Sequence, residues 1–334
     1  MRISQLVFLP AAGVLVALTA VPVPAGILNV VPGAHAAYSL RRLDDDYAGY
    51  AVQVRRDSDH TTQDIGFDGN GQLDTAALLG FVGAGNGYVT TWYDQAGSRN
   101  LSQATVGLQP QIVADGSLLL GPINALPALQ FSSSTLAYAG TGIGSETMSV
   151  LAAASWFPWT NPPPAQQTHV WRRLWTMRVG NASKAAFGGQ EDNIGKFAVA
   201  WATASGVTST ATDKSIEGNK PFVASYIYDA TQADGADTVH MYLDGELGWS
   251  RTNLTLADIA GVDYFDVGSL QGTTRFFDGF IQELILYHSV LPGTDRALVE
   301  GNMMSLYIPE PAGVLALLCA ALFCLGCHRP RPRR

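Results

Sequence analysis

The chain has 334 residues, of which 47% are hydrophobic and only 14% are charged, with 35 glycines, 17 prolines and a formal net charge of −8. This composition disfavours intrinsic disorder and helical bundles and favours a β-rich, turn-rich body. The negative charge argues against nucleic acid or anionic lipid as a partner.

Residues 1–36 have the features of a secretory signal peptide. A positively charged start precedes an apolar stretch over residues 6–20, and a small-x-small pattern ends at Ala36. We therefore expect cleavage between Ala36 and Ala37, which leaves residues 37–308 as the body. An uncleaved anchor is the alternative, since the apolar stretch is long and interrupted by proline.

The body is more acidic than the whole chain and contains no cysteine. Five basic residues lie outside the body, Arg2 and the last four arginines, but only one acidic residue, Glu310. The formal net charge of the body is therefore about −12. The three cysteines of the chain all follow the body. A hydrophobic core must therefore hold it together without disulfides, and a body of this length can bury one.

Short strands separated by turn residues dominate the body. Asp115-Gly116 and Asp244-Gly245 predict hairpin turns. Two short helices are predicted, the first after Asp74 and the second capped by Thr294. The predicted strands cover residues 50–55, 88–93, 126–138, 147–156, 173–179, 184–189, 196–204, 220–230, 238–252 and 276–291. This pattern predicts an all-β fold, a sandwich of two antiparallel sheets.

The loop before the first helix carries oxygen donors at alternating positions, Asp68, Asn70, Gln72 and Asp74. This is the opening spacing of a calcium loop, which makes Asp68, Asn70 and Asp74 candidate calcium ligands. The closing glutamate is missing, because Leu79 stands in its place. Asp74 also has the position of a helix N-cap, and capping is the favoured alternative.

The stretch from Tyr88 to Asn100 combines a β-branched, aromatic strand with an abrupt polar turn, Asp94-Gln95-Ala96-Gly97. A strand that ends in a carboxylate and an amide places polar groups at the rim of a sheet, where loops carry function. Asp94 and Gln95 are therefore candidate ligand-binding residues. The alternative is that both side chains only bond the turn.

The carboxyl terminus, residues 309–334, has three parts in order. Pro309-Glu310-Pro311 precedes an uncharged apolar segment, residues 312–327, and an arginine cluster ends the chain. Sixteen residues span roughly 24 Å as a helix, slightly less than a bilayer core. This arrangement resembles the PEP-CTERM sorting tail of bacterial envelope proteins. The resemblance implies export, a transmembrane helix as anchor, and removal of the tail by an exosortase-type enzyme.

The order of strands from Leu126 onward resembles the concanavalin A-like, laminin-G-type jelly roll. The matching segments are LPALQF (126–131), MSVLAAASW (148–156), VHMYLDGEL (239–247) and the final strand and helix, FDGFIQELILYHSVLPGTDRALVEGN (277–302). The front half, with AYSLRRL (37–43), VQVRR (52–56), TTWYDQAGSRNLSQA (90–104) and QPQIV (109–113), is similar to the start of the arabinofuranosidase B catalytic domain. This similarity implies a glycoside hydrolase acting on terminal arabinofuranosyl groups.

The catalytic carboxylates that this family uses are not evident in the sequence. A retaining glycosidase needs two carboxyl groups about 5 Å apart. The resemblance implies a glutamate on a central strand, but residues 196–206 contain no glutamate. It also implies an aspartate in the loop 267–279, but this loop has no carboxylate before Asp278. The candidate replacements are Asp94, Glu191, Asp192 and Glu283, each of which is by default a solvated or turn-capping carboxylate.

Two functions therefore remain open. The first is an exported, envelope-sorted surface protein whose sandwich is a non-catalytic carbohydrate-binding or structural module. Its partners are then a glycan or matrix polysaccharide, the exosortase, and the membrane through the C-terminal helix. Trp159, in a proline-rich loop, is a candidate to stack on sugar rings, whereas core packing is favoured for Trp156. The second function is a divergent α-L-arabinofuranosidase-type hydrolase. No cofactor is expected beyond the calcium considered above.

Overall fold

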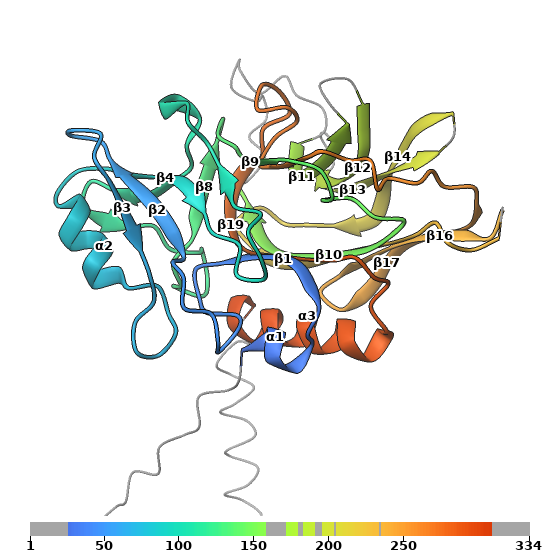
Figure 1. Cartoon of the computed structure of the whole chain (residues 1–334), viewed down its shortest axis with the longest axis horizontal. Helices are drawn as coiled ribbons and strands as arrows, with labels where there is room; N and C mark the ends of the chain where they lie inside the picture. Colours follow the sequence, from blue (N-terminus) through green and yellow to red (C-terminus); the bar gives the residue numbers. More distant parts are fainter. Residues whose placement is uncertain are drawn as a thin grey trace, which may run out of the picture.

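The computed structural model describes residues 26–157, 172–179, 183–190, 196–203, 205–233 and 235–308. Two layers of antiparallel strands make up the body (Figure 1). The first layer contains, in order of pairing, β3 (Thr62–Ile65), β2 (Val52–Arg56), β4 (Gly87–Trp92), β6 (Gln111–Ala114), β8 (Leu129–Ser132), β19 (Asp278–Tyr287), β10 (Thr147–Trp156), β15 (Pro221–Asp229), β16 (Asp237–Leu243) and β17 (Glu246–Leu254).

The second layer contains β5 (Leu101–Ser102), β9 (Leu136–Ala139), β18 (Tyr264–Val267), β11 (Arg172–Val179), β12 (Ser183–Gln190), β13 (Lys196–Thr203) and β14 (Gly206–Ser215). Strand β4 pairs with β5 and so joins the two layers. Strand β1 (Ala34–Ser39) pairs with the second half of β19, and β7 (Ser117–Leu118) pairs with β6. The structure thus confirms the nearly all-β, sandwich-like fold that the strand pattern predicts.

Aromatic side chains fill the space between the layers. Trp156 is 1% exposed and packs against Phe222 with ring centroids 4.8 Å apart, which confirms its predicted core position. Trp175 meets Tyr226 edge-on at 5.2 Å. The predicted hairpin turns at Asp115 and Asp244 are also confirmed, since both aspartates and the glycines after them have positive φ, as a two-residue hairpin turn requires.

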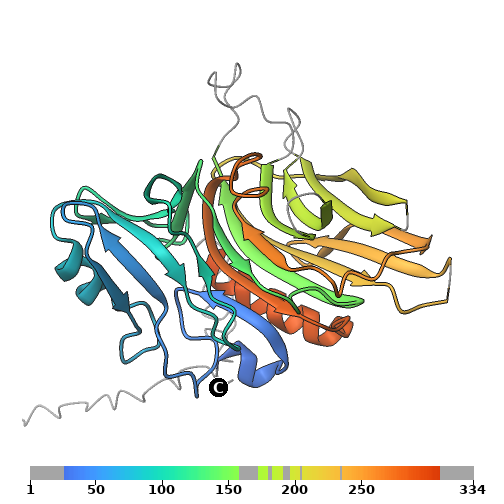
Figure 2. The ribbon, with the colours of Figure 1, turned by 45° about the horizontal axis from the view of Figure 1, so that its top comes forward.

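In the part of the chain that the structure describes, three α-helices and one short 3₁₀ helix accompany the sheets: α1 (Ile27–Val30), α2 (Thr75–Val82), η1 (Val106–Leu108) and α3 (Gly293–Tyr307). Helix α3 packs against the outer face of the first layer, where it contacts β10 and β15; in Figure 2 the strands partly cover it. It begins at Gly293, one residue before the predicted Thr294 cap, because the carbonyl of Pro292 already accepts a hydrogen bond from the N–H of Arg296.

The structure places the start of the body earlier than predicted. Ala36 and Ala37 lie in the middle of β1, are completely buried, and pair with Leu286 and Ile285 of β19. The side chains before them, Ile27, Leu28 and Val31, join the hydrophobic cluster beneath α3. Cleavage after Ala36 would cut a buried strand and remove part of this cluster, so the predicted boundary at Ala36–Ala37 is inconsistent with the fold.

The two segments predicted to meet a membrane lie outside the described residues. These are the apolar stretch 6–20 and the carboxyl-terminal segment 309–334, which includes Pro309, Glu310 and Pro311. Within the described ranges, no helix has both the length and the apolar character that crossing a bilayer requires.

Candidate glycan-binding site

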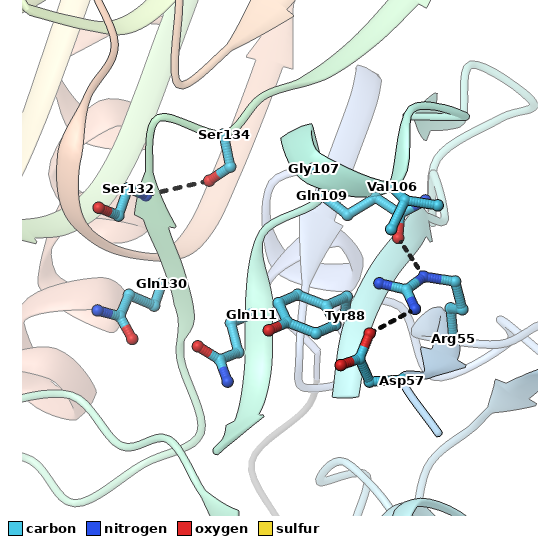
Figure 3. Close-up of a pocket in the computed structure, with 10 residues that line it drawn as sticks. All are labelled: Arg55, Asp57, Tyr88, Val106, Gly107, Gln109, Gln111, Gln130, Ser132 and Ser134. Atoms are coloured by element: carbon cyan, nitrogen blue, oxygen red, sulfur yellow. Dashed lines mark hydrogen bonds and ion pairs between the residues drawn. The ribbon is translucent and has the colours of Figure 1, made fainter. Parts of the chain in front are cut away.

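A polar pocket of about 270 Å³ lies on the outer face of the first layer, at its β2–β8 end (Figure 3). Its floor comes from strands β2, β4, β6 and β8, and its walls come from the segment around η1 and from the end of β8. The lining residues are Arg55, Asp57, Tyr88, Val106, Gly107, Gln109, Gln111, Gln130, Ser132 and Ser134. Amide and hydroxyl side chains predominate, which suits a ligand rich in hydroxyl groups.

The alternation of each strand explains why these side chains face outward. On β2, Val52 and Val54 are completely buried in the core, so Arg55 points to the opposite face. On β8, Leu129 and Phe131 are buried in the same way on either side of Gln130.

Arg55 is held rigidly at one end of the pocket. Its Nε donates to Oε1 of Gln109 at 2.7 Å, and its Nη1 donates to Oδ1 of Asp57 at 2.9 Å. The same Nη1 lies 2.9 Å from Nδ1 of His60. Since Asp57 balances the charge of Arg55, the pocket has no net formal charge among its lining residues, which favours a neutral ligand.

Tyr88 lies in the middle of the pocket, between Arg55 and Gln111 (Figure 3). The Arg55 guanidinium lies 4.9 Å from the centroid of its ring. Burial, together with the Asp57 carboxylate, raises the pKa of Tyr88 above its usual value, so the hydroxyl stays protonated at neutral pH. Tyr88 therefore offers both an apolar ring face and a hydrogen-bonding hydroxyl.

The pocket contains one carboxylate, Asp57, among its lining residues. Retaining and inverting glycosidases both use a pair of carboxyl groups that flank the scissile bond. Asp57 has no carboxylate partner in the pocket and already accepts a hydrogen bond from Arg55. The described lining residues of this pocket therefore do not include the pair of carboxyl groups that this mechanism uses.

The structure does not place Asp94 and Gln95 in this pocket. Asp94 is 1% exposed, and its carboxylate accepts three backbone N–H bonds, from Ala37 at 2.8 Å, Ala96 at 2.9 Å and Arg99 at 3.0 Å. The predicted roles in ligand binding and catalysis are therefore inconsistent with the structure, because this carboxylate is almost completely buried and already bonded to the backbone. Asp94 instead bonds its own turn through Ala96 and Arg99, as the alternative predicted, and it also links this turn to β1 through Ala37, which the sequence did not predict.

Gln95 has a comparable structural role. Its Oε1 accepts from the N–H of Leu43 at 2.8 Å, and its Nε2 donates to the carbonyls of Ser39 and Arg41 at 3.2 and 2.8 Å. The side chain is 4% exposed and thus links the turn to the chain after β1. A bound glycan could not reach it, so its predicted role in ligand binding is also wrong.

The candidate calcium ligands form a turn and a helix cap. Oδ1 of Asp68 accepts from the N–H groups of Asn70 and Gln72 at 2.8 and 2.9 Å. Asp74 caps α2 by accepting from the N–H of Ala77 at 2.9 Å, which confirms the capping alternative. Across the described ranges, no group of three or more histidine, cysteine, aspartate or glutamate side chains is arranged to hold a metal ion.

Replacing Asp74 by alanine is expected to lower the free energy of unfolding by about 1 kcal/mol, the usual cost of losing an N-cap. The loss should be the same in EDTA and in millimolar calcium, because the cap needs no metal. Urea denaturation under both conditions measures this. If calcium stabilised the unaltered chain but not Asp74→Ala, Asp74 would be a metal ligand instead.

Of the remaining candidates, the structure describes Glu283 but not Glu191, Asp192 or Trp159. Glu283 is completely buried on β19 and bonded to Arg41, far from being a solvated catalytic group. Asp278, the carboxylate that ends the loop 267–279 and was not a candidate, lies at the start of β19; burial raises its pKa, and its Oδ2 lies 3.8 Å from Nη2 of Arg172.

The comparisons with known proteins agree with the fold. Residues 29–117 match the family model described as "Alpha-L-arabinofuranosidase B, catalytic". The matched range includes the lining residues from Arg55 to Gln111 but not Gln130, Ser132 or Ser134. It also includes residues 29–36, in agreement with their place in the folded body. No curated protein matches the chain.

Among solved structures, the chain is similar to a mutant GH54 α-L-arabinofuranosidase soaked with 4-nitrophenyl α-L-arabinofuranoside, with a TM-score of 0.60 and 16% identity. An arabinofuranosidase complexed with arabinofuranosyl-α-1,2-xylobiose gives a TM-score of 0.60 and 14% identity. Each similarity covers 84% of this chain and 64% of the other. At these identities the comparison establishes a shared fold, and function must be argued from the site.

Proposed function

We propose that this chain is an exported surface protein whose sandwich binds a neutral glycan in the pocket around Tyr88 without hydrolysing it. The observation that carries this proposal is a tyrosine ring surrounded by amide and hydroxyl groups, with a single carboxylate that is paired with Arg55. Such a site provides a stacking surface and donors and acceptors for sugar hydroxyls, but not two catalytic carboxyl groups.

The proposed ligand is a pentose-containing plant or matrix polysaccharide. The arabinofuranosidase-type fold supports this class, since the similar solved structures carry arabinofuranosides. The proposed setting is the cell envelope, with residues 309–334 as the sorting tail, an exosortase-type enzyme as processing partner, and the apolar segment 312–327 as membrane anchor. Ile308, at the end of α3, lies directly before this tail.

The second candidate function is an arabinofuranosidase-type hydrolase, which the family match over residues 29–117 favours. Its carboxylates would have to come from Asp278, which does not line the pocket, or from Glu191 and Asp192, which lie outside the described residues.

We expect the full chain to bind arabinan or arabinoxylan fragments and to leave 4-nitrophenyl α-L-arabinofuranoside unhydrolysed. Binding is measured by calorimetry and hydrolysis by release of nitrophenol, with the single variants Glu191→Gln, Asp192→Asn and Asp278→Asn assayed beside the unaltered chain. Any turnover should be equal in all four, because it would come from a contaminant. Turnover that one of these variants abolishes would establish the hydrolase and refute the binding module.

A further inference from the structure

Four side chains form a continuous row across the strands of the outer face. Tyr88 on β4 pairs with Gln111 on β6, Gln111 pairs with Gln130 on β8, and Gln130 pairs with Phe280 on β19. Directly paired residues of antiparallel strands have side chains on the same face. The neighbours of these four along their strands, Val89, Ile112, Leu129 and Ile281, are completely buried on the core side.

Phe280 gives this row a second aromatic end. It is partly exposed, and its ring meets that of Phe157 edge-on, with centroids 5.2 Å apart and an interplanar angle of 82°. The pocket lining includes Tyr88, Gln111 and Gln130 but stops before Phe280. Since three inter-strand spacings of about 4.8 Å separate β4 from β19, the two aromatic residues stand roughly 14 Å apart. A single sugar ring cannot contact both.

We propose that the pocket is one end of an extended site that runs across the strands and binds several consecutive sugars of a linear neutral glycan. Tyr88 contacts one ring, Phe280 contacts another, and the side-chain amides of Gln111 and Gln130 bond the hydroxyl groups between them. This inference rests on the proposed function and adds the mode of binding: an extended stretch of chain rather than a single terminal sugar.

The polar groups between the two aromatic residues are available for a ligand. The side chain of Gln130 makes no hydrogen bond to another residue in the described ranges. Gln111 uses its Nε2 to donate to Asn86 and to the carbonyl of Val113, which leaves its Oε1 as an acceptor. Both amides therefore gain hydrogen bonds when a sugar binds, without giving up existing ones.

A glycan could also extend from the pocket along β4, toward other aromatic rings, but this path is less suitable for binding. Tyr50 is 50% exposed and lies beside Tyr93, with ring centroids 6.1 Å apart. The polar groups on that path already bond one another: Thr90 donates to Oε1 of Gln53 at 2.9 Å, and both Gln53 and Tyr93 donate to Asp64, at 3.0 and 2.7 Å. A sugar there would have to displace these bonds, so Tyr50 provides a matched aromatic control.

The test is calorimetric titration of the full chain with two series of probes, linear arabinan and linear xylan fragments, each from monosaccharide to hexasaccharide. We expect the affinity for one series to rise at least about tenfold from monosaccharide to tetrasaccharide, which is 1.4 kcal/mol. Phe280→Ala should remove this gain and leave the monosaccharide affinity unchanged, which also shows that the variant is folded. Gln130→Leu should remove part of the gain, and Tyr50→Ala should remove none.

The possible failures can be told apart. If the affinity does not depend on length, or if Phe280→Ala binds the tetrasaccharide as the unaltered chain does, the extended site is refuted while the pocket remains. Loss of the length dependence in Tyr50→Ala would show that the glycan runs along β4 instead, which also refutes the proposal. Absence of binding for every fragment of both series would overturn the proposed function, and this inference with it.

Discussion

Replacing Glu283 by glutamine is expected to lower the free energy of unfolding by about 3–5 kcal/mol, the usual effect of breaking a buried ion pair. The Glu283 carboxylate accepts from Nε and Nη2 of Arg41 at 2.8 Å each and from the hydroxyls of Ser39 and Tyr307 at 2.9 Å each. Glutamine has nearly the same shape but no charge, and its amide group would turn a donor toward these donors. Arg41 would remain as a buried cation without a counter-charge.

This network joins distant parts of the chain, so we expect its loss to lower the stability of the whole fold. Ser39 lies in β1, Glu283 in β19 and Tyr307 at the end of α3. Burial by itself would lower the pKa of Arg41, but the Glu283 carboxylate offsets this and raises that pKa, which shows that the two charges stabilise each other. Urea denaturation of the full chain measures the change.

Glu246→Gln provides the control. Glu246 forms an exposed ion pair with Lys214, with side-chain exposures of 74% and 37%, so its loss should cost less than about 1 kcal/mol. Equal midpoints of urea unfolding for Glu283→Gln and Glu246→Gln would contradict the structural role of the buried network.

Local signals in the sequence predicted the fold because they depend only on neighbouring residues. The turns at Asp115-Gly116 and Asp244-Gly245 and the cap at Asp74 belong to this class, and the structure confirms each of them. The predicted core position of Trp156 also rested on its strand.

The pocket around Tyr88 could not be predicted in the same way, because it depends on which strands become neighbours. Gln111 and Gln130 are paired across the sheet, and Gln130 is paired with Phe280, 150 positions later in the chain. No local pattern encodes that register. The only sign in the sequence was that single polar residues alternate with apolar ones on several strands, and a solvated sheet face has the same pattern.

The errors at Asp94 and at the amino-terminal boundary have the same physical origin. A turn carboxylate can point outward or back into the protein, and the N–H of Ala37, 57 positions away, decides this for Asp94. Ile27 and Leu28 follow an apolar stretch and so look like part of the signal peptide. They belong to the body because Val299 and Met303 of α3 share their cluster. Long-range packing thus assigned roles that composition left open.

Tyr88→Ala is expected to weaken binding of the preferred arabinan or xylan fragment about thirtyfold, equivalent to about 2 kcal/mol, the scale of a buried aromatic anchor. The ring is the only aromatic surface among the lining residues, and its loss leaves mainly polar groups, which water binds equally well. Tyr88→Phe keeps the ring and removes the hydroxyl, so its binding free energy should weaken only by the contribution of one hydrogen bond, about 1 kcal/mol. Calorimetric titration measures both variants.

The pair of variants also separates binding from stability. Tyr88 is only partly buried and Arg55 keeps its bonds to Gln109 and Asp57 when the ring is lost, so both variants should unfold at nearly the same urea concentration as the unaltered chain. If Tyr88→Ala binds as tightly as Tyr88→Phe, the ring does not stack on a sugar and the pocket is not the glycan site. If binding survives in Tyr88→Phe and is lost in Tyr88→Ala, the affinity comes from the ring face. The tyrosine offers only the ring and the hydroxyl, and Tyr88→Phe would have shown that the hydroxyl is dispensable.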